Sequence, residues 1–275
     1  MRKPYQHQFL RQLAFYDPDF YDPCVTVVGA GGIGSPVVWL LAKLGLRRIT
    51  VIDGDRVELH NLPTTMYSKT TLGLHKVLAL RKTVKRGTGV TIRAVVGKFR
   101  GGKLPKTDIL ISAVDSMDAR RMLFRAARLQ KIPFFVDGRI GGEKLRVYSI
   151  YMKDVHDRRL YKSTLVPNSR VSLLPCTAQQ VPDVGYAVSS MIVRAVRCWV
   201  ATGRWIPEIV YYQDQVELAQ VAEQKSLYND QEEDIAKMLG LLSSNLPEVP
   251  LVVEGGIDSK HPDPRAEPSA IMEGS

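Results

Sequence analysis

Residues 24–61 read CVTVVGAGGIGSPVVWLLAKLGLRRITVIDGDRVELHN, and this stretch decides the fold. It holds an apolar, β-branched run, a glycine loop, a helical pattern and a second apolar run that leads into acidic residues. Gly29, Gly31 and Gly34 form a G-x-G-x-x-G, which permits a tight turn, close approach of a ligand and close helix packing. Asp53 ends the second run, where its carboxylate can accept the two hydroxyls of a ribose. The stretch therefore predicts a nucleotide-binding βαβ unit.

The chain continues to alternate between strand and helix patterns up to about residue 137. We expect strands at 25–29, 49–53, 90–96, 109–114 and 134–137, and helices at 34–44, 72–85 and 117–130. Further on, we expect an antiparallel strand at 145–152, an irregular crossing segment at 153–182, a long helix at 184–200 and an edge strand at 209–212. The predicted fold class is α/β: a Rossmann-like open mixed sheet, mostly parallel, with helices on both faces and antiparallel C-terminal strands.

Four parts follow from this pattern. We expect an N-terminal helical segment at 1–22 (helical over 4–20), a nucleotide-binding domain at 23–214, a charged C-terminal helix at 215–242 and a flexible tail at 243–275. The acidic C-terminal part is thus predicted to be helical, then disordered.

Charge is unevenly distributed along the chain. The net charge is +10, yet fourteen acidic residues stand against four basic ones from Pro207 onward, so the preceding residues carry about +20. A nucleotide and an acidic protein partner account for such a basic body, and the tail can fold back on it or mediate assembly. The basic residues lack the interleaved aromatics of a single-strand binder, so we do not expect nucleic acid as a partner.

The cysteines and the apolar runs bear on localisation. Cys24, Cys176 and Cys198 form no C-x-x-C pair, which fits a reducing compartment and argues against a cysteine zinc site. We see no uninterrupted apolar run approaching the ~20 residues of a membrane span and no apolar signal core at the start. We therefore expect a cytoplasmic protein without a membrane segment.

Polar residues beyond Asp53 indicate the type of nucleotide. Asp115 follows a strand at the predicted ligand edge and can hold Mg²⁺ together with phosphates, or else cap the next helix. Lys76 can neutralise phosphate, although a helix lysine is usually solvated. Asn61 can contact ribose or phosphate, or merely form a turn. Together with Asp55, these groups suit a triphosphate and a metal better than a nicotinamide.

Five blocks of the chain resemble the ThiF/MoeB family of adenylating enzymes, which is related to the catalytic domain of ubiquitin-activating enzymes. The blocks are Gly29-Ala-Gly31-Gly32-Ile-Gly34-Ser35, Asp53-Gly-Asp55-Arg-Val57, Asn61-Leu62, Gly73-Leu-His-Lys76 and Asp115-Ser-Met-Asp-Ala-Arg120. The resemblance runs from about Arg11 to about Asp214. It implies Mg-ATP as cofactor and adenylation of the C-terminal carboxylate of a ubiquitin-like or sulfur-carrier protein, with release of pyrophosphate.

The resemblance also implies roles for individual residues. The glycines, Asp55 and Asp53 would bind the nucleotide, with Asp53 on the ribose. Asn61 and Lys76 would bind phosphate, and Asp115 would be the magnesium carboxylate. Arg11 would reach the ATP of a partner subunit, which implies a homodimer. Cys176 would take part in thioester or persulfide transfer, although a packed cysteine is the favoured alternative.

Three departures from the family pattern stand out. Thr64 occupies the position of a phosphate-binding arginine, so Arg11 or another cation must replace it, or catalysis is weak. Ser116 stands where the family has asparagine, and the paired C-x-x-C motifs of a structural zinc site are missing. Two other functions remain open: a ThiF-like binding scaffold that has lost catalysis and, with less support, a nicotinamide-dependent oxidoreductase.

Overall fold

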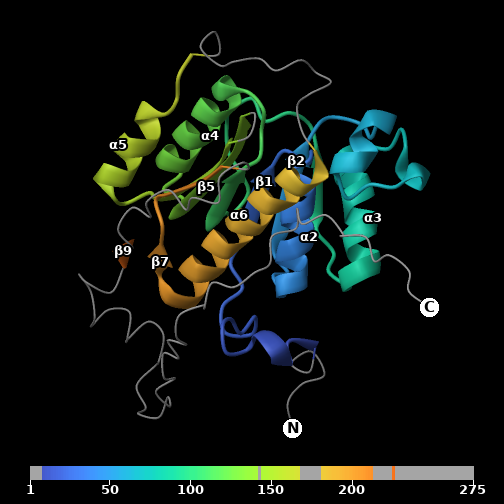
Figure 1. The fold of residues 1–275 in the computed structure, drawn as a ribbon, viewed down its shortest axis with the longest axis horizontal. Helices are drawn as coiled ribbons and strands as arrows, with labels where there is room; N and C mark the ends of the chain where they lie inside the picture. Colours follow the sequence, from blue (N-terminus) through green and yellow to red (C-terminus); the bar gives the residue numbers. More distant parts are fainter. Residues whose placement is uncertain (1–7, 142–143, 168–180, 213–224, 227–275) are drawn as a thin grey trace, which may run out of the picture. The chain divides into compact units, whose positions relative to one another are not determined.

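The computed structural model describes residues 8–141, 144–167, 181–212 and 225–226. Its strands form a seven-stranded sheet in the order β3-β2-β1-β4-β5-β6-β8 and a separate β7-β9 pair (Figure 1). Their bounds are β1 Val25–Val28, β2 Ile49–Asp53, β3 Arg93–Val96, β4 Ile109–Ser112, β5 Phe134–Gly141, β6 Lys144–Tyr151, β7 Arg204–Trp205, β8 Glu208–Tyr212 and β9 Lys225–Ser226. Strands β3, β2, β1, β4 and β5 are parallel, whereas β6 and β8 pair antiparallel. The predicted open mixed sheet is confirmed.

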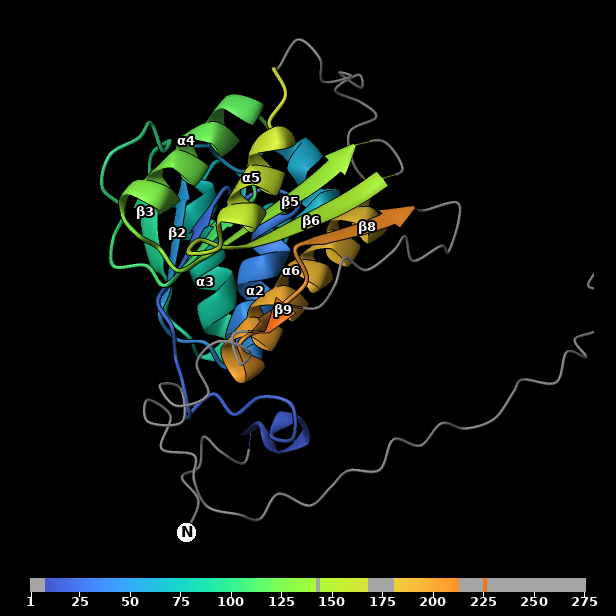
Figure 2. The same ribbon diagram turned by 90° about the vertical axis from the view of Figure 1, so that its left-hand side faces the viewer.

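Helices cover both faces of the sheet, as predicted. Helices α2, α3 and α6 lie on one face, and α4 and α5 lie on the other (Figure 1 and Figure 2). The α-helices are α2 Gly34–Leu44, α3 Lys76–Thr88, α4 Met117–Leu129, α5 Val155–Ser163 and α6 Pro182–Thr202, and the 3-10 helices are η1 Leu10–Gln12, η2 Leu59–Thr64 and η3 Lys69–Thr71.

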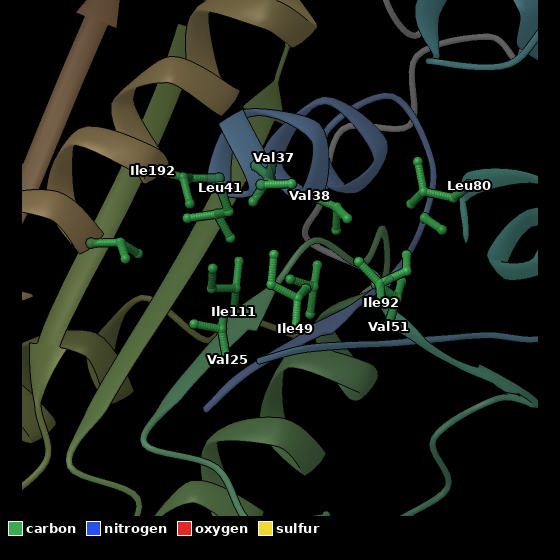
Figure 3. Packing of buried hydrophobic residues seen from close by; sticks show 14 of the residues in the cluster. Val25, Val37, Val38, Leu41, Ile49, Val51, Leu80, Ile92, Ile111 and Ile192 are labelled. Atoms are coloured by element: carbon green, nitrogen blue, oxygen red, sulfur yellow. The ribbon is translucent and has the colours of Figure 1, made fainter. Parts of the chain in front are cut away.

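Two buried clusters hold these layers together, because alternate residues of each strand point to opposite faces. On the α2 side, Val25 and Ile111 of the sheet lie beneath Val37 and Leu41 of α2 and Ile192 of α6 (Figure 3). These five side chains are 0–1% exposed, and each fully buried side chain of this size contributes about 1.5–3 kcal/mol. The continuous burial of β1 and β4 explains their largely apolar sequence.

The order of the strands reverses between β1 and β4. The chain passes from β1 outward to β2 and β3, then returns to β4 on the other side of β1. In open α/β sheets such a reversal opens a crevice at the carboxyl ends of the two strands, where ligands bind. Here the loop after β1 begins at Gly29 and the turn after β4 begins at Ala113, so these two segments border the crevice.

Among the described helices, α6 has the length and the apolar composition that a membrane-spanning helix needs. It packs on α2 and on β5 and β6, and buries a stripe that includes Val188, Ile192 and Val196. Ser189 Oγ also donates to the carbonyl of Ile33 in the glycine loop at 3.0 Å. Packing as a core helix accounts for the apolar composition of α6.

The predicted N-terminal helix is wrong for residues 9–20: Gln8 is helical, but beyond it the described chain contains turns and the 3-10 helix η1. Tertiary contacts override the helical pattern, because Gln12 Nε2 donates to the carbonyl of Leu44 at 2.7 Å. Pro18 disfavours helical backbone at Asp17, so a helix cannot run through this position without strain.

The predicted helix 72–85 begins later, at Lys76. Residues before it pair with the segment that follows β2: the amide of Val57 donates to Leu74 O, and the amide of Lys76 donates to Asp55 O, both at 2.8 Å. Gly73 takes a left-handed φ of 77°, which breaks a continuous helix. Lys76 therefore starts α3 rather than lying within it.

The crossing segment is also more regular than predicted, because it contains α5. Asp154 caps this helix by accepting the amides of His156 and Asp157 at 2.7 and 3.1 Å. The helix 215–242 and the tail fall outside the described residues, except that Lys225–Ser226 form β9 instead of helix.

Candidate functional site

The glycine loop closes tightly on the turn after β4. A Cβ atom on Gly29, whose φ is +97°, would lie 2.3 Å from the carbonyl oxygen of Ala113. One on Gly34 would lie 1.9 Å from the carbonyl oxygen of Gly29, so neither position accommodates a side chain. Around Gly31, in contrast, nothing lies within 4 Å of the Cβ position. The loop is thus packed at its two ends and open at the second glycine, where a ligand can approach the backbone at the start of α2.

Asp53 joins the end of β2 to this loop. One carboxylate oxygen accepts the amide of Ala30 and the other accepts the amide of Asp55, both at 2.7 Å. A carboxylate has about four lone-pair sites, so each oxygen keeps one for a further donor. Asp53 is half-buried and oriented by the backbone, as a ribose ligand requires.

A segment after η2 fixes the loop from the other side. Tyr67 is buried, and its hydroxyl donates to the carbonyl of Ala30 at 2.6 Å. Ser35 Oγ donates to the carbonyl of Gly31 at 2.8 Å and accepts the amide of Met66 at 3.2 Å. Burial, and then the nearby carboxylate of Asp53, raise the pKa of Tyr67 above its ordinary value, so Tyr67 remains a donor.

Two lysines converge on Asp55. Lys76 Nζ lies 3.4 Å from one carboxylate oxygen of Asp55 and Lys98 Nζ lies 3.5 Å from the other. The side chain of Lys76 is 13% exposed and starts α3, where the positive end of the helix disfavours a cation and favours an anion. Because the carboxylate offsets one of the two ammonium groups, this corner remains electropositive and can attract phosphate.

Asn61 has a structural role in η2. Its Oδ1 accepts the amide of Glu58 at 3.0 Å, and the side chain of Glu58 accepts the backbone amide of Asn61. These two hydrogen bonds form a capping box, so the turn-forming interpretation is confirmed. Its Nδ2 remains available for a ligand with respect to the described residues. Thr64 ends η2 without the charge of the family's arginine. Nearby, Arg56 is exposed and donates to the carbonyl of Gly73 at 2.7 Å, just before Lys76.

Asp115 lies exposed in the turn after β4, beside the glycine loop. The cap of α4 is Ser116, whose Oγ accepts the amide of Ala119 at 3.3 Å, so the interpretation of Asp115 as the cap is wrong. Asp115 makes no hydrogen bond or ion pair with the described residues. No group of three or more potential metal-ligating side chains occurs among them. A single free carboxylate fits Mg²⁺, which protein sites often hold through one or two carboxylates and substrate phosphates.

A buried ionic network is centred on Asp137, in the middle of β5. Asp137 is fully buried and accepts Arg120 Nε at 3.2 Å, Arg139 Nε at 2.6 Å and the Tyr161 hydroxyl at 3.0 Å. Burial, and then Asp137, raise the pKa of Tyr161 well above its ordinary value. Burial lowers the pKa of Arg139, but Asp137 and then Tyr161 outweigh this effect and raise it overall.

The network and its neighbour Arg121 hold the chain after α5. Arg139 donates to the carbonyl and hydroxyl of Thr164 at 3.1 and 3.0 Å. Arg121, one turn into α4, donates to the carbonyls of Leu165 and Val166 at 3.3 and 2.5 Å. The part of the crossing segment that follows α5 is therefore fixed to α4 and β5.

The predicted site residues do not all meet within one chain. The glycines, Asp53, Asp55, Asn61, Lys76 and Asp115 surround the carboxyl ends of β1, β2 and β4. Arg11 is exposed in η1, which packs against the far end of α2, about 16 Å from the loop by helix length. Cys176 lies outside the described residues, Cys24 is buried and Cys198 is half-buried.

Sequence reasoning missed Lys98, Tyr67 and the Asp137–Arg139 pair. Lys98 and Tyr67 lie in loops, where no periodicity marks a contact with the site. Asp137-Gly138-Arg139 carried a signal, because two opposite charges follow an apolar strand at the predicted ligand edge.

Comparison with known proteins identifies the family of the chain. The model of the ThiF family matches residues 22–237. Ubiquitin-like modifier-activating enzyme 5 of Caenorhabditis briggsae is 34% identical over 115 residues, which is 36% of this chain and 27% of the relative. Adenylyltransferase and sulfurtransferase MOCS3 of Oryza sativa subsp. japonica is 32% identical over 125 residues, 45% of this chain and 24% of the relative. The chain thus spans about a quarter of the length of these curated relatives.

Solved structures share the fold. E. coli MccB with ATP has a TM-score of 0.61 and 16% identity, and covers 82% of this chain and 73% of that one. E. coli MccB with MccA-N7isoASN has a TM-score of 0.63 at the same identity, and covers 82% of this chain and 74% of that one. At this identity the likeness concerns the fold alone, whereas the family model covers most of the sequence. The chain belongs to the ThiF family.

Proposed function

We propose that this protein adenylates the C-terminal carboxylate of a small ubiquitin-like or sulfur-carrier protein, with ATP as co-substrate. One observation carries the proposal: the open glycine loop, the oriented Asp53, the Asp55–lysine corner and the free Asp115 all follow the carboxyl ends of β1, β2 and β4, the edge of the sheet where ligands bind in open α/β folds. The ThiF membership and the names of the relatives, an activating enzyme and an adenylyltransferase, support the same reaction.

The nucleotide would bind along this edge of the sheet. Its ribose would lie at Asp53 and its α-phosphate near the backbone at Gly31 and the start of α2. Lys76 would bind the outer phosphates together with Asn61 Nδ2. Lys98 is the nearest additional cation to this corner, and we assign to it the role of the arginine that Thr64 replaces.

Asp115 would hold a magnesium ion, which supplies positive charge on the phosphate oxygens when bound. The rest of the catalysis is positioning by the chain. A carboxylate oxygen of the partner attacks the α-phosphorus, the bond to the bridging oxygen breaks, and pyrophosphate leaves with that electron pair. Lys76 stabilises the charge that accumulates on the leaving oxygens, and no proton transfer is needed.

Three further parts of the proposal depend on the family resemblance. Arg11 would act on the nucleotide of a second copy, since within one chain it lies at the far end of α2. We therefore propose a homodimer. We also propose a cytoplasmic location, because the cysteine content fits a reducing compartment. Cys176 would attack the acyl-adenylate as a thiolate and form a thioester, with AMP as the leaving group. A Cys176→Ser variant that still exchanges pyrophosphate but forms no thioester would support this step.

ATP–pyrophosphate exchange tests the central reaction. Purified full-length protein should exchange labelled pyrophosphate into ATP when a carrier ending in Gly-Gly is added. Asp115→Asn should lower this rate by about 10² or more, because one electrostatic stabiliser is lost. The mechanism would be overturned if no carrier stimulated the exchange, or if Asp115→Asn exchanged pyrophosphate at the wild-type rate.

A binding scaffold without catalysis is the second candidate, because Thr64 removes a phosphate-binding charge. A carrier that binds with ATP present but produces no exchange would select it. Thr64→Arg in the same assay distinguishes weak catalysis from none, since a weakened enzyme should gain rate and a scaffold should not.

A further inference from the structure

Helices α4 and α5 lie side by side on the face of the sheet opposite α2, α3 and α6 (Figure 1 and Figure 2). Side chains of these two helices line a cleft. Its volume is about 330 Å³, and its lining residues are Phe124, Arg128, Val155, Arg158, Arg159 and Lys162. Arg128 is about three turns along α4 from the turn that carries Asp115. The cleft is thus separate from the nucleotide crevice.

Helical spacing explains why these residues share one groove. Val155, Arg158, Arg159 and Lys162 stand at positions i, i+3, i+4 and i+7 of α5, which is one face of a helix. Phe124 and Arg128, four residues apart, form the matching face of α4.

The cleft has four cations and no carboxylate in its lining. The acidic residues of α5 are occupied elsewhere: Asp154 caps the helix, and buried Asp157 accepts Trp205 Nε1 at 2.7 Å. Arg158 donates to the carbonyl of Met152 at 2.9 Å. The remaining three cations form no hydrogen bond or ion pair with the described residues; they are Arg128, Arg159 and Lys162.

The floor of the cleft is apolar but offers no aromatic face. Phe124 is 9% exposed, and its ring packs against Phe135 and Tyr161 with centroids 5.8 and 4.8 Å away. Val155 is 49% exposed beside it. Single-stranded nucleic acid needs exposed ring faces for its bases, so this floor favours an aliphatic side chain over a base.

The size of the cleft also favours a side chain of a peptide as its occupant. A volume of about 330 Å³ lies at the low end for small-molecule sites and admits one or two side chains. A rim of cations around a small apolar floor complements a peptide with carboxylates on both sides of one apolar residue.

We propose that this cleft binds an acidic segment of a partner protein. The segment places one aliphatic side chain against Phe124 and Val155, and its carboxylates pair with Arg128, Arg159 and Lys162. The site is independent of the adenylation reaction, because none of its residues contacts the nucleotide crevice.

Fluorescence anisotropy with the full-length protein tests the proposal. The probe is a labelled peptide rich in glutamate with a single central leucine, and the comparison probes are the same peptide with serine in place of leucine and a single-stranded DNA of equal charge. The cleft variant is Arg159→Glu with Lys162→Glu. Its matched control is Lys82→Glu with Arg86→Glu, which makes the same charge change on exposed residues of α3 on the opposite face.

Peptide affinity should fall about tenfold or more in the cleft variant and much less in the control, since only the former breaks close charge pairs. Val155→Ser should weaken the leucine peptide and leave the serine peptide unchanged. Because Arg159, Lys162 and Val155 are exposed, these variants should fold, and unchanged circular dichroism checks this.

Equal losses in the cleft and control variants would reduce the effect to overall charge and overturn the proposal. Cleft-dependent binding of DNA more tightly than peptide would assign the site to nucleic acid instead. Absence of peptide binding to the wild type would also overturn it.

Discussion

Asp115 lies in the turn after β4 and Asp137 lies within the neighbouring strand β5, and the fold uses their carboxylates in opposite ways. Asp137 pairs in register with Ser112 of β4, is fully buried and accepts three hydrogen bonds from side chains. Asp115, three residues beyond Ser112, is exposed and has no partner among the described residues. The carboxylate of Asp137 stabilises the fold, whereas the carboxylate of Asp115 can bind a ligand.

The largest expected effect is a difference in the free energy of unfolding between variants of these two carboxylates. Asp137→Asn should lower the free energy of unfolding by about 3–5 kcal/mol, because two buried guanidinium groups lose their counter-charge. Asp115→Asn, the matched control, should leave it unchanged within about 0.5 kcal/mol. Urea denaturation followed by circular dichroism measures both. Similar losses in the two variants would break the comparison.

The second effect concerns activity at the Asp55 corner. Lys76→Gln should lower the rate of pyrophosphate exchange by about 10², because a cation near the leaving oxygens is lost. Its stability should change little, since its pairing with half-exposed Asp55 is worth at most about 1 kcal/mol. Lys82→Gln, on the same helix but exposed, serves as the control. A loss of stability in place of activity would make Lys76 a structural residue.

The third effect compares two glycines of one loop. Gly29→Ala should destabilise the protein by about 2 kcal/mol, because alanine is strained at this φ and meets the carbonyl of Ala113. Gly31→Ala should keep the melting temperature but weaken ATP binding, because its new methyl group points into open space at the proposed phosphate site. Equilibrium dialysis with ATP measures the affinity. Unchanged ATP binding in Gly31→Ala would place the nucleotide elsewhere.

The smallest effect concerns Tyr67 and alkaline pH. Tyr67→Phe should cost about 1 kcal/mol at pH 8, because its hydrogen bond to Ala30 is lost. Burial raises the pKa of Tyr67 in the folded protein, so the unfolded chain loses this proton first, from about pH 10 upward. The stability that Tyr67 contributes is therefore fully present below about pH 10 and is lost as the pH rises above it.

Removal of Tyr67 should make that alkaline decline shallower, by at most about 1.4 kcal/mol per pH unit. Urea denaturation between pH 8 and pH 11 gives both slopes. Identical slopes in wild type and Tyr67→Phe would show that the tyrosine ionises as easily in the folded protein as in the unfolded chain.

The βαβ unit and the glycine loop could be predicted because local sequence determines them. The apolar run of β1, the glycine spacing and the cap at Gly45, whose φ is 104°, are each sufficient signals within a few residues. The end of β2 likewise placed Asp53 beside the loop, because parallel strands present their carboxyl ends at one edge.

Tertiary contacts decided what the sequence did not reveal. Helix α5 is polar along most of its length and depends on the cap at Asp154 and on buried Asp157 and Tyr161. The partners of Asp137 come from α4, β5 and α5, so no local sequence pattern predicts them. Lys98 similarly reaches Asp55 across 43 positions of chain.

The carboxylate of Asp55 has a consequence for the protein before any nucleotide arrives. Two ammonium groups and the positive end of a helix gathered at one corner would otherwise repel each other and push the lysines outward. A resident anion keeps them in place, so under the proposed function an incoming phosphate would exchange one negative partner for another and find the cations already aligned.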